Sequence, residues 1–282
     1  MSGILYLVPT PIGNLGDISK RMADIMTAVD FIAAEDTRVS VKLLNHLGIK
    51  KPMVSYYRHN VEVGGQAVLD RLLAGESCAL VTDAGTPAIS DPGEELVVLC
   101  AAHGVTVIPI PGPCAMVVAL SASGLPTGRF TFEGFLPMNK KNRRAQLLSL
   151  AAEERTMIFY EAPHKLCATL CDLREAFGAD RRIALCRELT KLHEEVRRCT
   201  IGAAAEWYAA NPPKGEFVLV IEGACPRVED KVSAEDGAAL METYRAQGLS
   251  HKDAARRAAA ETGLSKNQLY GLSRGNDAGD GD

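Results

Sequence analysis

The sequence predicts an α/β protein with a mostly parallel sheet, organised as two α/β domains and a small helical module. Short apolar runs recur through the first 225 residues, and glycine, proline or acidic residues bound them, as is typical of buried strands. Longer stretches with helical spacing lie between the runs, and this alternation favours a parallel sheet. A chain of 282 residues is long enough for about two domains.

Seven apolar runs are the predicted strands. They lie at residues 4–8, 30–34, 78–82, 105–110, 156–160, 182–186 and 217–221. Five segments between them have the apolar spacing of helices, at residues 22–28, 39–47, 94–103, 114–123 and 166–177. Ligands of such sheets bind beyond the carboxyl ends of the strands. We therefore expect the chemistry in the residues that follow each run.

Two stretches suggest domain boundaries, because small residues, glycine and proline gather at 121–129 and the apolar pattern is interrupted at 223–234. We expect an N-terminal α/β domain at 1–120, a second α/β domain at 121–225, a helical module at 234–275 and a disordered tail at 276–282. In the module, Ser250 caps an alanine-rich helix that Gly263 ends, and Ser265 caps another helix. This is a helix-turn-helix outline.

Composition excludes several classes of protein. A net charge of -4 argues against a protein that coats nucleic acid through bulk electrostatics, so any RNA site must be a local patch. The eight cysteines include no Cys-x-x-Cys pair, and neither they nor the histidines have the spacing of metal ligands, so we expect no metal. The N-terminus lacks the features of a secretory signal, and no apolar run approaches the roughly 20 residues that span a bilayer. We expect a cytoplasmic protein with no membrane partner.

Polar and glycine-containing segments follow four of the predicted strands. TPIGNLGD at 10–17 is neither a dinucleotide fingerprint nor a phosphate-binding Walker loop, and a tight turn is its alternative reading. EDTR at 35–38 could equally be a helix cap or an ion pair. The loops within 78–93 and 107–115 place glycine, proline and threonine where a backbone comes close to a ligand. Two such loops at successive strand ends suggest one shared pocket.

A wider set of motifs carries a resemblance to a known family. The set is TPIGNLGD, EDTR, VTDAGTPAISDPG, PGPCA, FEGFLP at 132–137, FYEAPHK at 159–165 and ELTKLHEE at 188–195. These motifs, in this order and from residue 5 to about residue 272, resemble the tetrapyrrole methylase superfamily, and within it the enzymes that methylate small-subunit ribosomal RNA. The resemblance implies two α/β domains with S-adenosylmethionine held in the cleft between them.

The resemblance also implies positions for the cofactor. They are Pro11, Asp83, Ala84, Gly85, Thr86, Ile89, Cys114, Ala115, Tyr160, Glu161 and Leu189. Cys114 stands where the resemblance implies a serine, so a side-chain hydroxyl is missing there, whereas backbone contacts would remain.

The implied reaction is methylation of the ribose 2′-hydroxyl of a cytidine in the decoding region of 16S ribosomal RNA. The implied substrate is the small ribosomal subunit, and the implied assembly is a homodimer. Such a transfer is an in-line displacement that needs alignment and a group that takes the hydroxyl proton. The candidates for catalysis are Glu35, Asp36, Arg38, Glu161, His164, Glu188 and Lys191. The sequence does not choose among them.

RNA binding needs positive charge, and residues 140–144 hold four cations in five positions. Lys140, Lys141, Arg143 and Arg144 are the candidates for contact with phosphates, and a solvated helix start is the alternative. The C-terminal helices could grip RNA or dock on a partner subunit.

Two other functions remain open at this stage. One is a methylase of small tetrapyrrole rings with the same fold. The other is a non-enzymatic regulator that binds nucleic acid through residues 250–272 and leaves most of the chain without a role.

Overall fold

The computed structural model describes residues 2–225, 233–267 and 269. The chain divides into two compact units, Met1–Ala224 and Cys225–Asp282. The first unit contains two five-stranded sheets, and the second is helical. The disordered tail predicted at 276–282 lies outside the described residues. None of the described helices is long and apolar enough to cross a membrane.

The first sheet is entirely parallel. Its strands are β1 (Ile4–Leu7), β2 (Phe31–Ala34), β3 (Met53–Ser55), β4 (Cys78–Val81) and β5 (Thr106–Pro109), in the order β3-β2-β4-β1-β5. Because β1, β2, β4 and β5 run in the same direction, the loops that follow them all leave from one edge of the sheet.

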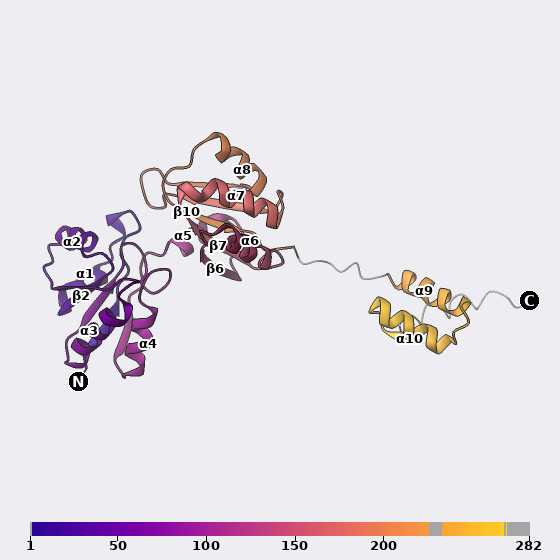
Figure 1. Cartoon of the computed structure of the whole chain (residues 1–282), viewed down its shortest axis with the longest axis horizontal. Helices are drawn as coiled ribbons and strands as arrows, with labels where there is room; N and C mark the ends of the chain where they lie inside the picture. The colour runs from indigo at the N-terminus through magenta and orange to yellow at the C-terminus, as the bar shows by residue number, and fades with distance from the viewer. Residues whose placement is uncertain (1, 226–232, 268, 270–282) are drawn as a thin grey trace, which may run out of the picture. The chain divides into compact units, whose positions relative to one another are not determined.

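Helices cover both faces of this sheet (Figure 1). They are α1 (Lys20–Ala28), α2 (Thr37–His46), α3 (Val61–Leu73) and α4 (Glu94–Ala102), with a short 3-10 turn η1 (Leu15–Asp17) before α1. Alternate residues of β2 enter different cores: Phe31 packs with residues of α3 and α4, and Ile32 packs with residues of α1 and α2. Burial on both faces explains why these strands are continuous apolar runs.

The second sheet is mixed. Its strands are β6 (Phe130–Phe135), β7 (Thr156–Glu161), β8 (Arg182–Arg187), β9 (Glu195–Thr200) and β10 (Phe217–Ile221), in the order β6-β7-β10-β8-β9. Only β6 and β7 are parallel, and the other neighbours are antiparallel. The prediction of a mostly parallel sheet is therefore wrong for this half, because an apolar run reports burial and not strand direction.

Four helices pack on the second sheet: α5 (Ala115–Ser123), α6 (Lys140–Ser149), α7 (Pro163–Phe177) and α8 (Ile201–Ala210). The last three cover one face, and α5 covers the other, where Ala119 and Leu120 pack with Ile158 and Val218. The chain thus reaches the second sheet through α5. A division of this unit at residue 120 stays a proposal.

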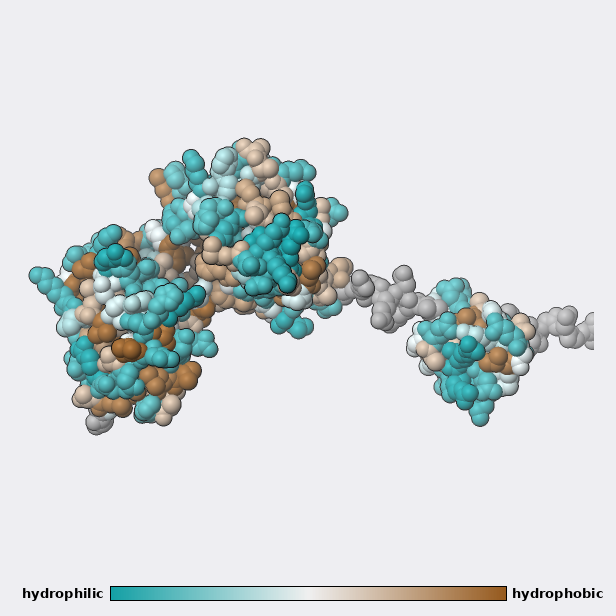
Figure 2. All heavy atoms as spheres, in the orientation of Figure 1, coloured by the Kyte–Doolittle hydropathy of each residue, from teal (hydrophilic) through white to brown (hydrophobic). Residues whose placement is uncertain are grey.

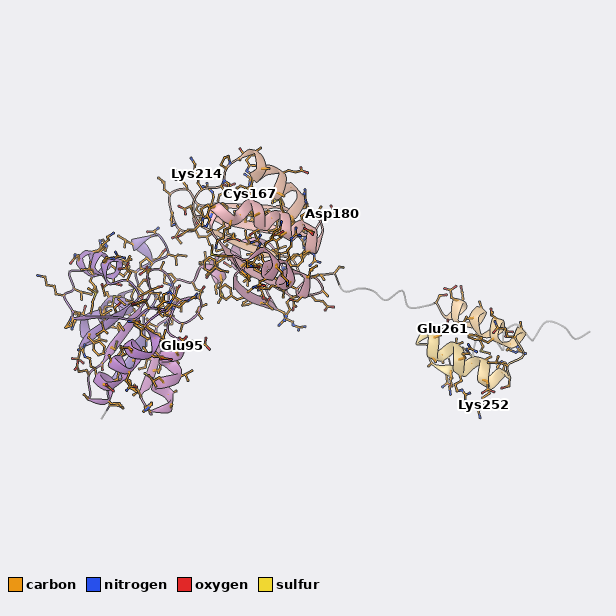
Figure 3. All side chains as sticks on the ribbon, in the orientation of Figure 1. Glu95, Cys167, Asp180, Lys214, Lys252 and Glu261 are labelled. Carbon is orange, nitrogen blue, oxygen red and sulfur yellow. The ribbon has the colours of Figure 1, made fainter. Side chains whose placement is uncertain are left out.

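The second unit contains α9 (Ala234–Ala246) and α10 (His251–Thr262), which lie side by side (Figure 1). The predicted caps of α10 are confirmed: the Ser250 side chain accepts a hydrogen bond from the Asp253 amide, and Gly263 is left-handed with φ 71°. Alanines of α10 pack against Met241 and Tyr244 of α9. The visible surface of this unit is mostly hydrophilic (Figure 2), and Lys252 and Glu261 mark the two ends of α10 (Figure 3).

A buried ion pair joins α6 to α7. Arg143 Nε donates to Asp172 Oδ2 at 2.8 Å, and Arg144 Nε donates to Asp172 Oδ1 at 3.0 Å. Arg144 also pairs with Glu175. The side chain of Asp172 is only 4% exposed. Burial alone would raise the pKa of Asp172, but the two arginines outweigh it and the pKa is lowered.

This pairing gives Arg143 and Arg144, two of the four cations predicted to contact phosphates, an anionic partner within the protein. Arg143 and Arg144 hold α6 against α7, and a side chain with Arg143's 12% exposure cannot reach far into solvent. Lys140 and Lys141, in contrast, are exposed and make no ion pair with any described residue. They are the two members of the cluster left free for phosphate.

Replacement of Arg143 by alanine should therefore destabilise the protein, because it leaves Asp172 buried with one cation instead of two. We expect the free energy of unfolding to fall by about 2–4 kcal/mol. Lys140→Ala and Lys141→Ala are matched controls that should change it by less than about 0.5 kcal/mol. Urea denaturation of the three variants measures the difference, and equal stabilities would show that the arginine has no structural role.

Candidate active site

A pocket of about 580 Å³ lies at the carboxyl edge of the first sheet. Residues that follow β2, β4 and β5 line it from this sheet, and residues of β7, β8 and β10 line it from the second sheet. This is the place where parallel sheets bind ligands. The volume lies within the roughly 300–1,000 Å³ of small-molecule sites.

The pocket gathers ten of the eleven positions that the sequence analysis gave to the cofactor. They are Asp83, Ala84, Gly85, Thr86, Ile89, Cys114, Ala115, Tyr160, Glu161 and Leu189. Pro11 is not among the lining residues, and its neighbour Ile12 is. The structure thus brings together segments that are up to about a hundred residues apart in the sequence, although cofactor binding by each residue stays a prediction.

Short hydrogen bonds tie the loops of the first sheet together beneath the pocket. Thr10 and Gly85 exchange backbone hydrogen bonds of 2.9 and 3.0 Å. The Thr86 hydroxyl donates to the carbonyl of Pro113 at 2.8 Å. Gly85 has a φ of 88°, which favours glycine, and a Cβ there would lie 3.4 Å from Ile12 Cγ2. The loops after β1, β4 and β5 therefore form one rigid wall.

Tyr160 joins the second sheet to the start of α5. Its hydroxyl oxygen accepts a hydrogen bond of 3.1 Å from the Met116 amide, and Cys114 at the N-cap position makes no side-chain cap. Burial raises the pKa of Tyr160 to about 12, so the phenol stays protonated at neutral pH. The ring packs edge-on against Phe132 and Phe135. A tyrosine thus supplies the cap that Cys114 does not make.

Three carboxylates line the side of the pocket next to β2 and β4: Glu35, Asp83 and Asp91. Asp83 Oδ1 accepts from the Asp36 amide at 3.2 Å, and Glu35 Oε2 accepts from the Asp83 amide at 3.4 Å. Burial raises the pKa of Glu35, and the nearby charge of Asp91 raises it further. Burial and Asp83 likewise raise the pKa of Asp91. Each carboxylate therefore takes up a proton more readily than it would in water.

Other candidates for catalysis are engaged in ion pairs. Asp36 pairs with Arg38, whose hydrogen bonds lower the pKa of Asp36 to about 2, and neither residue lines the pocket. Asp36 also caps α2 through the Arg38 amide. The structure therefore places this pair beside the pocket, in the structural role that the sequence left open.

Lys191 lines the pocket and pairs with two carboxylates. Its ammonium lies 2.9 Å from Glu188 Oε1 and 2.8 Å from Glu216 Oε2. Burial would lower the pKa of Lys191, but these hydrogen bonds outweigh it and the pKa is raised. The hydrogen bond from Lys191 also lowers the pKa of Glu188, which does not line the pocket.

The segment around Lys191 is a strained loop that reaches across to the first sheet. Glu188 and Thr190 have positive φ angles of 50° and 66°, which are uncommon for residues other than glycine. The side chain of Lys191 packs on Gly13, where a Cβ would lie 2.5 Å from Lys191 Cγ. Strained backbone gathers at functional sites. Gly13 in TPIGNLGD thus makes room for a residue of the second sheet.

Glu161 and His164 line the pocket from the end of β7 and the start of α7. Glu161 is buried, and its two oxygens accept from the Ala162 amide at 2.8 Å and from the Thr169 hydroxyl at 2.5 Å. His164 is exposed. Glu161 therefore fixes the turn into α7, and His164 is the freer of the two.

Several lining residues were not singled out from the sequence: Ile12, Glu216, Phe217, Val218, Cys186, Phe135, Ser90 and Asp91. Asp91 and Phe135 lie within the quoted motifs VTDAGTPAISDPG and FEGFLP, so a signal for them existed. The sequence holds no signal that Glu216 and Val218 line the pocket, because their place there depends on the antiparallel pairing of β10 with β7 and β8. No three histidine, cysteine or acidic residues in the described part of the chain could together hold a metal ion.

Comparisons with protein families agree with this architecture. Residues 4–205 match the model of the Tetrapyrrole (Corrin/Porphyrin) Methylases, and residues 232–273 match the RsmI C-terminal HTH domain. Among solved structures, diphthine synthase superposes with a TM-score of 0.60 at 15% identity, over 78% of this chain and 90% of that one. Uroporphyrin-III C-methyltransferase from Thermus thermophilus, complexed with S-adenyl homocysteine, gives a TM-score of 0.54 at 17% identity, over 78% and 97%. These structures show the fold alone.

Curated relatives are much closer in sequence. The ribosomal RNA small subunit methyltransferase I of Synechocystis sp. is 51% identical over 271 residues, which cover 96% of this chain and 97% of that protein. The protein of the same name from Vibrio cholerae is 46% identical over 95% of this chain and 93% of its own length. The chain therefore belongs to the tetrapyrrole methylase family, in the branch of the ribosomal RNA small subunit methyltransferases I.

Proposed function

We propose that this chain transfers the methyl group of S-adenosylmethionine to ribosomal RNA of the small subunit, and that the acceptor is the 2′-hydroxyl of a cytidine in the decoding region. Relatives that are named ribosomal RNA small subunit methyltransferase I are 45–51% identical over at least 95% of the chain, and they support methyl transfer to small-subunit RNA. The solved uroporphyrin-III and cobalt precorrin-4 methyltransferases are 17–19% identical to this chain and share its fold, so they give no support to a tetrapyrrole substrate. One observation carries the proposal: ten of the eleven positions predicted for the cofactor line one pocket beside a half-buried carboxylate, Glu35.

The residues of the pocket fit S-adenosylmethionine. When bound, the cofactor supplies a methyl group on a positively charged sulfur. The wall at Ala84, Gly85 and Ala115 has little or no side chain, so a ligand can approach the backbone. Acidic groups at Glu35 and Asp83 suit the ligand's positive charge and can accept hydrogen bonds from its donors. One solved structure of this fold contains S-adenyl homocysteine, so the fold itself can hold a ligand of this kind.

The geometry favours Glu35 as the group that takes the hydroxyl proton. A lysine base needs a lowered pKa, and the pKa of Lys191 is raised. Asp36 and Glu188 are held ionised by Arg38 and Lys191, and both oxygens of Glu161 already accept hydrogen bonds. Glu35 lines the pocket, and its raised pKa makes it a better proton acceptor at neutral pH.

Lys140 and Lys141 are the proposed phosphate contacts on the second sheet. Phe135 lines the pocket at the end of β6, and α6 begins at Lys140 five residues later. The Asn139 side chain caps α6 by accepting from the Asn142 amide at 3.2 Å. A helix N-terminus favours anions, and two exposed lysines add to this effect. RNA that contacts Lys140 and Lys141 would therefore lie next to the part of the pocket that Phe135 lines.

Three further parts of the proposal come with the resemblance. They are a homodimer, a location in the cytoplasm and recognition of RNA within the assembled small subunit. The function as a whole is tested by mapping ribose methylation by mass spectrometry in small-subunit RNA from cells that lack this chain, before and after treatment with the purified protein and S-adenosylmethionine. The proposal would be contradicted if small-subunit RNA from those cells carried every ribose methyl group found in cells that have the chain.

Ala84→Leu should weaken binding of S-adenosylmethionine. Ala84 is exposed in the pocket, so the larger side chain enters the space of the ligand without a packing clash in the core. We expect a loss of affinity of about tenfold or more, measured by calorimetry. Ala84 is preferred to Gly85 because a side chain at Gly85's positive φ would also strain the backbone. Ala209→Leu, at an exposed position of α8, is the matched control. Equal affinities in the two variants would place the cofactor elsewhere.

Glu35→Gln should lower kcat by about 10²–10⁴, because the amide cannot take the proton. The affinity for S-adenosylmethionine should change little, since the side chain keeps its shape. His164→Gln is the comparison, because His164 is the exposed catalytic candidate that lines the pocket. Single-turnover methylation measures both, and a larger loss in the histidine variant would transfer the role to His164.

Asp91→Asn should move the acidic limb of the pH profile to lower pH. The base must be deprotonated, so kcat falls as the pH drops below the pKa of Glu35. The charge of Asp91 raises that pKa, and its removal must lower it. The pH dependence of kcat with both substrates saturating measures the shift. A limb that moves to higher pH would contradict the assignment of Glu35.

A further inference from the structure

The loop between β3 and α3 lies at the carboxyl edge of the first sheet, and hydrogen bonds fix its shape. The Tyr56 amide donates to the carbonyl of Ala34 at 2.8 Å, and the Tyr56 side chain is fully buried. The Asn60 side chain accepts from the Tyr57 amide at 2.7 Å and donates to the carbonyl of Ser55 at 2.9 Å. Between these two anchors, Tyr57, Arg58 and His59 are exposed.

A groove of about 720 Å³ lies against this loop. Arg58, His59 and Asn60 line it from the loop, Glu62 lines it from the first turn of α3, and Glu95 and Leu99 line it from α4. Glu95 is labelled in Figure 3. The groove therefore combines a cation, a histidine ring, an amide, two carboxylates and an apolar floor. None of its residues takes part in the pocket described above.

Arg58 connects the groove to the active-site pocket. It lines the groove, and the hydrogen bond from the Tyr56 amide to Ala34, the residue before Glu35, holds its loop next to the strand end that carries Glu35. The charge of Arg58 also opposes the rise in the pKa of Glu35 and of Asp91. Within the described part of the chain, no carboxylate lies within ion-pair distance of Arg58. An exposed arginine without a pairing partner, beside a pocket of acidic groups, is well placed for an external anion.

The three exposed side chains share a property that matters for RNA. Tyrosine, arginine and histidine all present flat faces, and proteins that bind unpaired RNA stack bases on such faces. Tyr57 and His59 lie edge to face with ring centroids 6.5 Å apart. Glu62 and Glu95 would repel a phosphate but can accept hydrogen bonds from the amino groups of a base. Arg58 is thus suited to a phosphate, whereas Glu62 and Glu95 are suited to the amino groups of a base.

We propose that this groove and the exposed loop beside it hold an unpaired nucleotide of the substrate RNA that neighbours the methylated one. Its base lies against His59, which lines the groove, and against Tyr57, which is exposed next to His59 without lining the groove, and its phosphate faces Arg58. The proposal rests on the proposed function, because it takes RNA to be the substrate. It adds a contact on the first sheet to that of Lys140 and Lys141 on the second. One surface follows a strand of the first sheet and the other follows a strand of the second, and residues of both sheets line the pocket, so we expect an RNA strand with its ribose at Glu35 to contact both.

The test compares Arg58→Gln, Arg58→Lys and Tyr57→Ala with the full-length protein. Tyr57→Ala should weaken affinity for small-subunit RNA on the order of tenfold through lost stacking. Arg58→Gln should flatten the slope of log affinity against log salt by about 0.7, the value for one phosphate of single-stranded nucleic acid. Arg58→Lys keeps the charge and should keep the slope. None of the three should change the affinity for S-adenosylmethionine.

Arg174→Gln is the matched control. It removes an exposed arginine near the far end of α7, about 15 Å along the helix from His164, and should leave the slope unchanged. If wild-type protein methylates the RNA, and Arg58→Gln and Tyr57→Ala bind RNA with the wild-type affinity and slope, the groove proposal is overturned and the proposed function stands. A change in the pH profile alone would also overturn it, because Arg58 would then act only on Glu35. A wild-type protein that methylates no ribosomal RNA would overturn both.

Discussion

The parallel order of the first sheet is the constraint on which the site depends. Four strands that run in one direction release their loops at one edge, and the exchange of hydrogen bonds between Thr10 and Gly85 locks two of these loops together. Residues of the second sheet line the other side of the pocket. Tyr160 of β7 accepts a hydrogen bond from the start of α5, and the side chain of Lys191 packs on Gly13. That edge therefore brings the positions predicted for the cofactor together in one pocket.

Much of this arrangement could be predicted from sequence, because buried parallel strands and loop glycines have local signals. The strands β1, β2, β4 and β5 were found as apolar runs, and the caps of α10 as Ser250 and Gly263. The apolar runs do not predict the short β3, or β6 and β9, since none of the three has a continuous apolar run. The direction of β10 was also out of reach, because antiparallel pairing with β7 and β8 is decided by contacts between distant segments.

The roles of the charged residues were the hardest to predict from the sequence, because each role depends on an ion-pair partner that can lie far away in the chain. Asp172 lies 29 residues from Arg143, and no local pattern reveals that the two meet. Lys191 could have been a base from sequence alone, yet Glu216, 25 residues away, keeps it protonated. Asp36 and Arg38 are neighbours, and here the ion pair could be anticipated. The structure thus narrows the catalytic candidates by showing which charges are already paired.

The charges that remain unpaired are distributed in a way that suits two substrates of opposite charge. Glu35, Asp83 and Asp91 make the interior of the pocket acidic, which suits a cationic cofactor and would repel the phosphates of RNA. Free cations lie outside it, at Arg58 after β3 and at Lys140 and Lys141 at the start of α6. Under the proposed function, such an arrangement would attract the RNA backbone to the rim, while only a ribose, which carries no charge, would enter the acidic interior. A protein with a net charge of -4 can in this way bind a polyanion, because attraction at short range depends on where the cations lie and not on their excess.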